Sequence, residues 1–361
     1  FAFNENSNSV YGVIRLVQPN TPASDALLKR GDIFYAIDGV RLTSDNLRSL
    51  IGNDTFTLNL GFYNDNGTPD DTSDDSIDPL NEDVTLTKVS YTEDPIFKTE
   101  VLNVGGENVG YLMYNGFIRN SENQLNAVFA DFKGNNIRQL VLDLRYNPGG
   151  SVLTTAYLAS MITGQFTGQI FEKLRYNNNQ EENNFDFLFY NALTTRDPLN
   201  SLGLNKIYIL ATGGSASASE GLINGLNPYI EVIHIGTNTV GKTQASRTLY
   251  DSPDFTKDGV NPKHTYAMQP LIANGLNKND NQVPGTGLVP TIGYEYREDM
   301  KTGLAAAANG GYTLLGLMPN TLPVIDNKGQ VSYMKKLSAK NIVDVVPIGA
   351  ISKGCEGNDL A

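Results

Sequence analysis

The sequence predicts a mixed α/β protein with a small β-rich domain ahead of a larger domain, and three observations support this prediction. Strand-like and helix-like segments alternate at short spacing between residues 109 and 236, which is typical of a largely parallel sheet covered by helices. Residues 1–95 instead contain short strand patterns and one short helix. The length of 361 residues allows two or three domains, each with its own core.

The composition argues against several classes of function. The chain has 39 acidic and 27 basic residues, and the formal charge of -12 repels phosphate backbones and anionic membrane surfaces. We therefore expect no nucleic-acid partner. No apolar run approaches the roughly 20 residues that a membrane-spanning helix needs. The single cysteine, Cys355, excludes an internal disulfide and leaves the redox compartment open.

The first domain is predicted to begin with a strand over residues 11–17. A turn follows, in which Thr21 or Ser24 caps a short helix that continues to Leu28. Residues 31–39 then predict a turn, a buried strand and a hairpin turn. The start at Phe1 has neither the basic region nor the cleavage site of a signal peptide, so we expect the chain to begin within a folded element.

An acidic, turn-rich insert is predicted at residues 64–83. Its spaced carboxylates and amides could wrap a calcium ion, but the closing bidentate glutamate of a full calcium loop is missing. The alternative is a solvated hairpin tip whose charges repel one another. The residues in question are Asp65, Asn66, Asp70, Asp71, Asp74, Asp75 and Asp78.

The second domain is expected over residues 96–320, after a connector at 91–107. Its Leu140-Val141-Leu142 run is typical of a strand that is covered on both faces. Residues 304–308 have a helix-like composition, and residues 321–361 remain unassigned. The predicted strands are 109–114, 137–145, 206–210 and 229–236, and the predicted helices are 121–132, 152–162 and 217–226.

A double-glycine turn follows the strand that ends near Asp143. In the segment 143–150, Asp-Leu-Arg-Tyr-Asn-Pro-Gly-Gly, the glycines allow the backbone to approach a ligand and to turn its N–H groups outward, as an oxyanion site requires. Asn-Pro-Gly-Gly is also an ordinary turn sequence. We expect Asp143 and Arg145 to be structural partners rather than catalytic residues.

A serine-rich segment, residues 213–220, lies between a predicted strand and a predicted helix. Ser217 at the helix start sits where free N–H groups and the helix dipole favour developing negative charge, which suits a nucleophile. Ser217 and Glu220 also form the pattern of a capping box, which requires no activity. The two interpretations are compatible, because Glu220 can support the turn that presents Ser217.

A serine nucleophile needs a base, and the chain has only two histidines. His234 falls in an apolar strand and His264 in a loop, and neither has an acidic neighbour in sequence to orient it, so we expect both to be structural. Lysine can act as the base where burial lowers its pKa. Lys242, in Gly-Lys-Thr-Gln just after the third strand, is the candidate.

These segments together resemble the carboxyl-terminal processing, or tail-specific, serine protease family. The shared features are Asp-Leu-Arg-x-Asn-Pro-Gly-Gly, Ser-Ala-Ser-Glu at a helix start, and Gly-Lys 25 residues after Ser217. Gly285 to Pro290 matches the closing motif of the family, with Thr291 where aspartate is usual. The resemblance implies a crotonase-like core in which Ser217 attacks, Lys242 is the general base, and the amides of Gly150 and Ala218 form the oxyanion hole. Ser215 and Ser219 are then bystanders.

The first domain resembles a PDZ domain, which adds an incoming peptide to a sheet edge. The similarity rests on Pro22-Ala23 and on Gly31-Asp32-Ile33 through Asp38-Gly39. It implies that Phe1, Ala2 and Phe3 belong to the loop and strand that bind the peptide carboxylate. The glycine expected before them is not in the sequence.

The third catalytic position departs from the family pattern. A glutamine usually lies four residues after the lysine, but here Ser246 takes that place and Gln244 lies two residues after Lys242. If the segment is extended, Lys242, Gln244 and Ser246 share one face, so either residue could orient the amine.

The resemblance therefore implies a serine endopeptidase that uses no cofactor and cuts protein substrates near a free carboxyl-terminal tail, outside the cytoplasm. The family preference is for apolar or small terminal residues. A catalytically impaired peptide-binding protein is the alternative, and acyl chemistry on a small molecule is a third hypothesis, because a fold alone does not fix a function.

Overall fold

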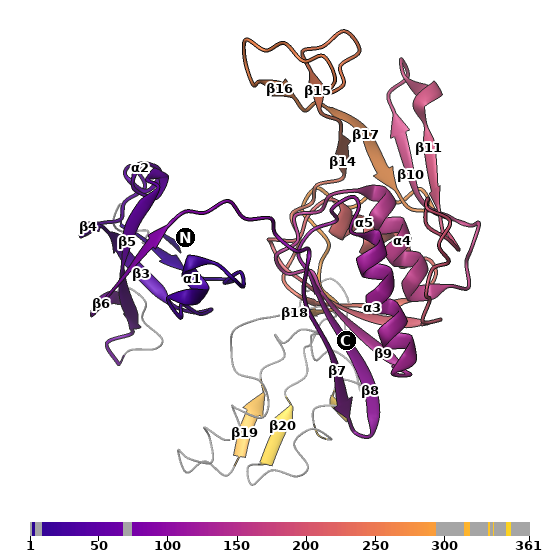
Figure 1. Cartoon of the computed structure of the whole chain (residues 1–361). Coiled ribbons are helices and arrows are strands. Elements are labelled where there is room, and N and C mark those ends of the chain that lie inside the picture. The colour runs from indigo at the N-terminus through magenta and orange to yellow at the C-terminus, as the bar shows by residue number, and fades with distance from the viewer. Residues whose placement is uncertain are drawn as a thin grey trace, which may run out of the picture. The chain divides into compact units, whose positions relative to one another are not determined.

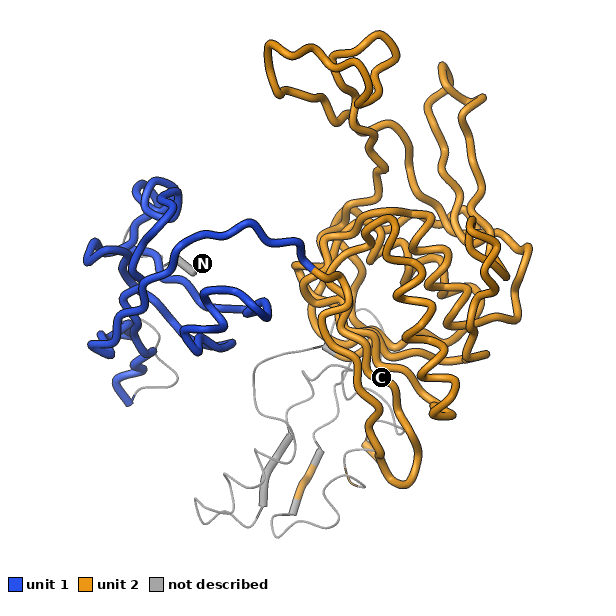
Figure 2. Tube along the Cα trace, in the orientation of Figure 1, with its two compact units in different colours: residues 1–93 blue, residues 94–361 orange. Residues whose placement is uncertain are grey.

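The computed structural model describes residues 2–3, 9–67, 74–293, 314–317, 331–332, 335 and 344–347. The chain divides into two compact units, residues 1–93 and 94–361 (Figure 2). Within the described residues, no helix is long and apolar enough to span a membrane.

Unit 1 is built on an antiparallel sheet in the order β1-β2-β3-β5-β6, with β4 paired to β3. Its core joins Val10, Phe34, Ile37, Leu42 and Leu58. The predicted helix is confirmed, and Thr21 is its N-cap. It ends at Asp25, before the predicted end at Leu28. The elements are β1 (Ala2–Phe3), β2 (Val10–Val13), α1 (Pro22–Asp25), β3 (Ile33–Ile37), β4 (Val40–Arg41), α2 (Leu47–Gly52), β5 (Thr55–Asn64) and β6 (Ser76–Thr87).

The acidic insert predicted at residues 64–83 is in large part a long hairpin. Residues 76–83 belong to β6, which pairs with β5 from Asn64↔Ser76 to Thr55↔Thr87. Asp78 accepts hydrogen bonds from Asn64 Nδ2 at 2.8 Å and Ser76 Oγ at 2.9 Å. No group of three His, Cys, Asp or Glu side chains placed to hold a metal ion occurs among the described residues.

The residues assigned to the peptide carboxylate are only partly described. Ala2 and Phe3 form β1, which pairs antiparallel with Tyr11 and Val10 of β2. Phe1 lies outside the described residues.

Unit 2 contains the predicted, largely parallel sheet, in the order β18-β13-β12-β9-β8-β7. All neighbouring strands in this sheet run parallel except β7 and β8. The strands are β7 (Ile96–Val104), β8 (Glu107–Tyr114), β9 (Gln139–Asp143), β12 (Lys206–Ala211), β13 (Glu231–Gly236) and β18 (Ile292–Gly293).

Strand β7 corrects the expectation of a connector at residues 91–107. It forms a hairpin with β8 through Gly105 and Gly106. Both glycines have positive φ, 61° and 90°, which is the backbone conformation that a tight two-residue hairpin turn requires. This hairpin turn therefore allows residues 96–104 to form an edge strand, although their sequence lacks a strong hydrophobic pattern.

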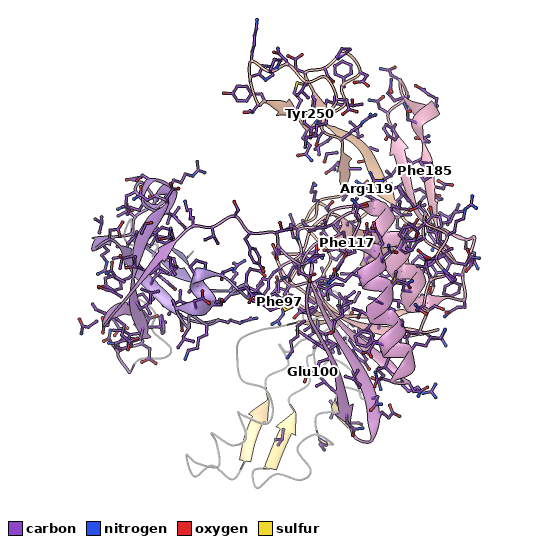
Figure 3. The ribbon with its side chains drawn as sticks, viewed as in Figure 1. Phe97, Glu100, Phe117, Arg119, Phe185 and Tyr250 are labelled. Carbon is purple, nitrogen blue, oxygen red and sulfur yellow. The ribbon has the colours of Figure 1, made fainter. Side chains whose placement is uncertain are left out.

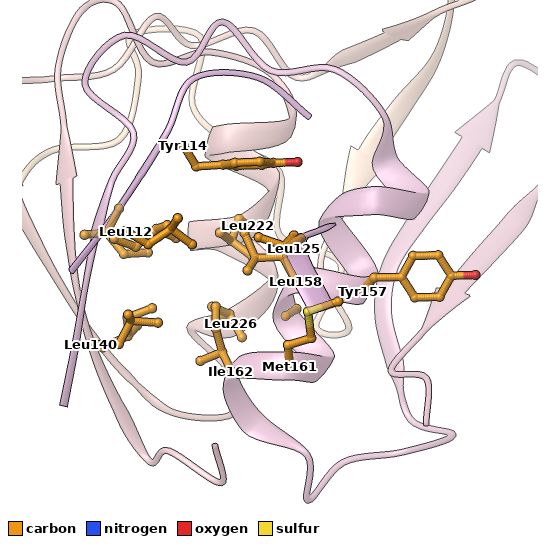
Figure 4. Packing of buried hydrophobic residues seen from close by; sticks show 14 of the residues in the cluster. Leu112, Tyr114, Leu125, Leu140, Tyr157, Leu158, Met161, Ile162, Leu222 and Leu226 are labelled. Carbon is orange, nitrogen blue, oxygen red and sulfur yellow. The ribbon is translucent and has the colours of Figure 1, made fainter. Parts of the chain in front are cut away.

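Three helices lie together along one face of the sheet: α3 (Glu122–Gly134), α4 (Val152–Thr163) and α5 (Ala218–Leu226) (Figure 1). Figure 4 shows Leu112 and Leu140 of the sheet near Leu125, Leu158 and Leu222 of the helices. Ten of the twelve residues of α4 are buried, and this is the reason for its almost continuous run of small and apolar side chains.

A second sheet, in the order β11-β10-β17-β14, was not predicted. It brings together β10 (Ile170–Tyr176), β11 (Phe185–Leu188), β14 (Gln244–Ser246) and β17 (Leu271–Leu276), and α5 packs against β10 and β17. Residues 247–270 extend from this sheet as an arm with β15 (Leu249–Tyr250) and β16 (Ala267–Met268). Figure 3 shows Tyr250 on the arm and Phe185 on β11.

Two further strands, β19 (Leu314–Leu317) and β20 (Asp344–Pro347), pair in parallel. A 3-10 turn, η1, spans Glu181–Asn183. The helix expected at residues 304–308 and Cys355 lie outside the described residues.

Candidate active site

Ser217 occupies a strained turn between β12 and α5. Its backbone angles, φ 57° and ψ -115°, are in a region that a non-glycine residue rarely adopts. Such a turn between a strand and a helix is the geometry that exposes a nucleophilic serine. The hydroxyls of the neighbouring serines are used elsewhere, since Ser215 donates to Leu144 O at 2.7 Å and Ser219 to Asn147 O at 2.9 Å. Ser217 is therefore the serine of this segment that fits a nucleophile.

Asn147 joins the glycine turn to the serine turn. It is fully buried, and its carbonyl accepts from Ala216 N at 3.2 Å as well as from Ser219. Its side chain donates to Tyr114 O and accepts from Gly149 N, both at 2.9 Å. The side chain and the carbonyl of one residue thus link three segments of the chain, which explains why an ordinary turn sequence holds a single conformation here.

Gly149 lies directly against the nucleophile turn. A methyl group on Gly149 would lie 2.7 Å from Ser217 Cβ and 2.9 Å from Ala218 N, and φ is +106°. Only glycine satisfies both conditions. The two turns that carry the candidate oxyanion amides are therefore in contact.

The amides of Gly150 and Ala218 remain available. Around Gly150, Phe117 N donates to Gly149 O at 2.9 Å and Ser151 N donates to Phe117 O at 2.7 Å. Among the described residues, neither the Gly150 amide nor the Ala218 amide donates a hydrogen bond. Paired amides with no acceptor suit a developing oxyanion.

Glu220 links the serine turn to the lysine loop. Its fully buried carboxylate accepts from Ser217 N at 2.8 Å, as the capping-box pattern predicted, and from Lys242 N at 3.0 Å and Gly241 N at 2.7 Å. The hydroxyl of Thr239 donates to the same carboxylate. One side chain therefore fixes the backbone of both Ser217 and Lys242, although they are 25 residues apart.

Ser217, Ala218 and Lys242 line one cavity between α5 and the second sheet. Gln244 of β14 lines it as well. Ser246 is not among the lining residues, and its Oγ accepts from Gln269 Nε2 at 3.2 Å. Of the two residues considered for orienting the amine, the structure brings Gln244 to the cavity with Lys242.

Neither histidine reaches the cavity. Burial lowers the pKa of His234, which lies in β13 with 3% of its surface exposed. His264 lies on the arm, where its Nε2 is 3.0 Å from Asp251 Oδ2.

Asp143 and Arg145 form an ion pair at 2.6 Å, and Tyr111 donates to Asp143 at 2.7 Å. Burial and this hydrogen bond raise the pKa of Tyr111 to about 12. Neither member of the pair lines the cavity, which agrees with the expectation of structural partners.

Glu172 of β10 is a lining residue that the sequence analysis did not identify. It is 8% exposed, and burial raises its pKa to about 7. No local pattern marks it, because only the pairing of β10 with β17, a strand about 100 residues further along the chain, brings it to the cavity.

Comparison with known proteins shows the family of the chain. A model described as peptidase family S41 matches residues 108–292, just over half of the chain. The crystal structure of a Bacteroides fragilis NCTC 9343 protein assigned as an S41 protease superposes with a TM-score of 0.65 and 27% identity, over 86% of this chain and 81% of the other. The photosystem II D1 C-terminal processing protease has a TM-score of 0.47 and 18% identity, over 78% and 68% of the two chains.

A separate, short similarity concerns another class of protein. A stretch of 70 residues, 19% of the chain, is 47% identical to the dihydroorotase of Ruminiclostridium cellulolyticum, and a stretch of the same length is 51% identical to that of Acetivibrio thermocellus. The chain spans only 16% of each of these enzymes, so their activity does not carry over. The S41 match covers the strands, turns and helix that build the cavity, and the chain therefore belongs to peptidase family S41.

Proposed function

We propose that this chain is a serine endopeptidase in which Ser217 is the nucleophile and Lys242 the general base. The observation that carries the proposal is the cavity that both residues line, with the backbone of each fixed by Glu220. Family membership supports a serine protease, and the strained turn at Ser217 supports the choice of nucleophile.

The proposed reaction begins when the Lys242 amine removes the proton from Ser217 Oγ, which attacks the peptide carbonyl. The amides of Gly150 and Ala218 donate to the oxyanion, and the lysine returns its proton to the leaving amine. Water then attacks the acyl-enzyme with Lys242 again as base. Gln244 is the better candidate to orient the amine, because it shares the cavity with Lys242.

The protease core is proposed to be crotonase-like over residues 96–320, and residues 1–95 to be a PDZ-like domain that binds the carboxyl-terminal tail of the substrate. A location outside the cytoplasm is part of the same proposal. A peptide substrate with a free carboxyl terminus should be cut faster than its carboxamide, since a tail-binding site recognises the carboxylate. Equal rates for the two would contradict tail recognition.

Casein hydrolysis by the unaltered chain, Ser217→Ala and Lys242→Ala tests the catalytic proposal. We expect both variants to lose activity at least 10³-fold while they keep the melting temperature of the unaltered chain. Full activity of Lys242→Ala would exclude lysine as the base.

Peptide binding without catalysis is the second candidate function. It is favoured by the position of Ser246, which takes the place of the family glutamine but bonds to Gln269 outside the cavity. Under this alternative the unaltered chain binds unfolded peptides and turns over none between neutral and mildly alkaline pH.

A further inference from the structure

Glu172 is a buried carboxylate with an oxygen that has no hydrogen-bond partner among the described residues. This oxygen, Oε2, is inaccessible to solvent. An unsatisfied buried polar group is costly, and each one in a native structure calls for an explanation. The reason here follows from where the carboxylate lies.

Two glycines make room for the carboxylate beside the nucleophile helix. A methyl group on Gly221 would lie 3.1 Å from Glu172 Oε2, and one on Gly275 would lie 2.7 Å from Oε1. Gly221 is in the first turn of α5, four residues after Ser217. The carboxylate thus lies one helical turn along from the candidate nucleophile and lines the same cavity.

The amide side chains of the cavity wall form no hydrogen bond with the Glu172 carboxylate among the described residues. Asn277 Nδ2 donates to Asn224 O at 3.2 Å and to Asn224 Oδ1 at 3.1 Å, so these two amides satisfy each other. Lys173, the next residue in β10, does not line the cavity and forms an ion pair with Asp280 at 2.8 Å, whereas Lys242 does line the cavity. Within the part of the chain that the structure describes, no cation forms an ion pair with Glu172.

The rest of the wall is mixed in character. Val152, Leu174, Leu276 and Val283 contribute apolar side chains, and Lys242, Thr243 and Gln244 contribute polar ones. The apolar part suits the aliphatic stem of a long unbranched side chain. A cationic group at the end of that stem would form a charge-assisted hydrogen bond with the Glu172 carboxylate.

We propose that Glu172 determines the specificity of the protease, by making this cavity the pocket for a lysine or arginine side chain immediately before the scissile bond. The inference rests on the proposed function for the identity of the reaction. It differs from the apolar or small preference that the family resemblance implies, because the cavity wall carries a carboxylate.

Matched peptides that differ only in the residue before the scissile bond test the proposal. Lysine and norleucine have the same unbranched stem and differ in the terminal charge. We expect kcat/KM for the lysine peptide to exceed that for the norleucine peptide at least tenfold, and Glu172→Leu to reverse the preference. Glu172→Gln, which keeps the size of the side chain, should reduce the ratio to near one. The exposed Glu181→Gln is the matched control and should keep the original ratio.

A product-binding measurement separates this inference from the proposed function. Calorimetry on Ser217→Ala, with and without Glu172→Gln, compares peptides that end in lysine and in norleucine. We expect at least tenfold tighter binding of the lysine peptide, and loss of this difference in the double variant. Active enzyme with an unchanged ratio in both Glu172 variants would overturn the pocket assignment while the protease proposal stands. If the chain cuts no substrate but binds the lysine peptide in a way that depends on Glu172, the pocket assignment stands and the protease proposal is overturned.

Discussion

Two buried glutamates near the same cavity have opposite surroundings. Glu220 accepts hydrogen bonds from three backbone amides and the Thr239 hydroxyl, whereas Glu172 keeps an oxygen without a partner among the described residues. Glu220 therefore has the contacts of a residue that holds two loops in place, and we call it the clamp. Glu172 has the contacts that we expect of a residue that binds a ligand. The comparison shows that the bonding of a buried carboxylate, rather than its burial, indicates its role.

The largest effect is expected from removing the clamp. Glu220→Ala leaves the amides of Ser217, Gly241 and Lys242 without their acceptor, and each buried group that stays unsatisfied costs about 1–3 kcal/mol. We expect a loss of at least 100-fold in kcat on casein and a lower midpoint in urea unfolding. Glu220→Gln should also lose activity, because its NH₂ group would face backbone donors.

The exposed Glu231→Gln, which removes only a surface ion pair with Lys206, is the control for this prediction and should retain activity. Activity of Glu220→Gln equal to that of the control would show that the clamp does not position the two loops.

An intermediate effect is expected from pH on the stability of the unaltered chain. Because the folded-state pKa of Glu172 is raised from 4.5 to about 7, the folded chain holds a proton that the unfolded chain releases. This contribution is fully present below pH 4.5 and is lost as pH rises through about 7, and it corresponds to about 3 kcal/mol.

Urea unfolding of the unaltered chain and of Glu172→Gln between pH 4 and pH 8 measures this contribution. The unaltered chain should lose more unfolding free energy than the variant as pH rises, and the two curves should separate mainly between pH 4.5 and 7. Parallel curves would mean that the Glu172 carboxyl is not desolvated.

The smallest effect is expected from Gly221→Ala, which narrows the space around Glu172. The new methyl would lie 3.1 Å from Oε2, so the carboxylate must shift, while alanine raises the helix propensity of α5 by about 1 kcal/mol. We expect a several-fold lower kcat/KM for the lysine peptide at nearly unchanged stability. Gly134→Ala, at the end of α3 with nothing within 4 Å, is the control. An equal change in the lysine and norleucine peptides would contradict a specific effect on the pocket.

Local signals were enough to predict several elements. The apolar runs that became β9, β12 and β13 predicted strands, and the pattern of Ser217 and Glu220 predicted the start of α5. The same holds for the contact between Ser217 and Glu220, which are three residues apart. The glycine turn at residues 147–150 and the serine turn were likewise visible as motifs.

The contacts between these segments could not be predicted in the same way, because they join residues far apart in the chain. The second sheet pairs β10 with β17 and β14 with β17, and the edge strand β7 depends on its hairpin with β8. Glu172 reaches the cavity, and Glu220 reaches Gly241 and Lys242, through contacts between residues far apart in sequence. Strand pairing and the hydrogen bonds of a buried carboxylate depend on partners that no local pattern encodes. The contact of Glu220 with Ser217 could therefore be predicted, but its contacts with Gly241 and Lys242 and the position of Glu172 in the cavity could not.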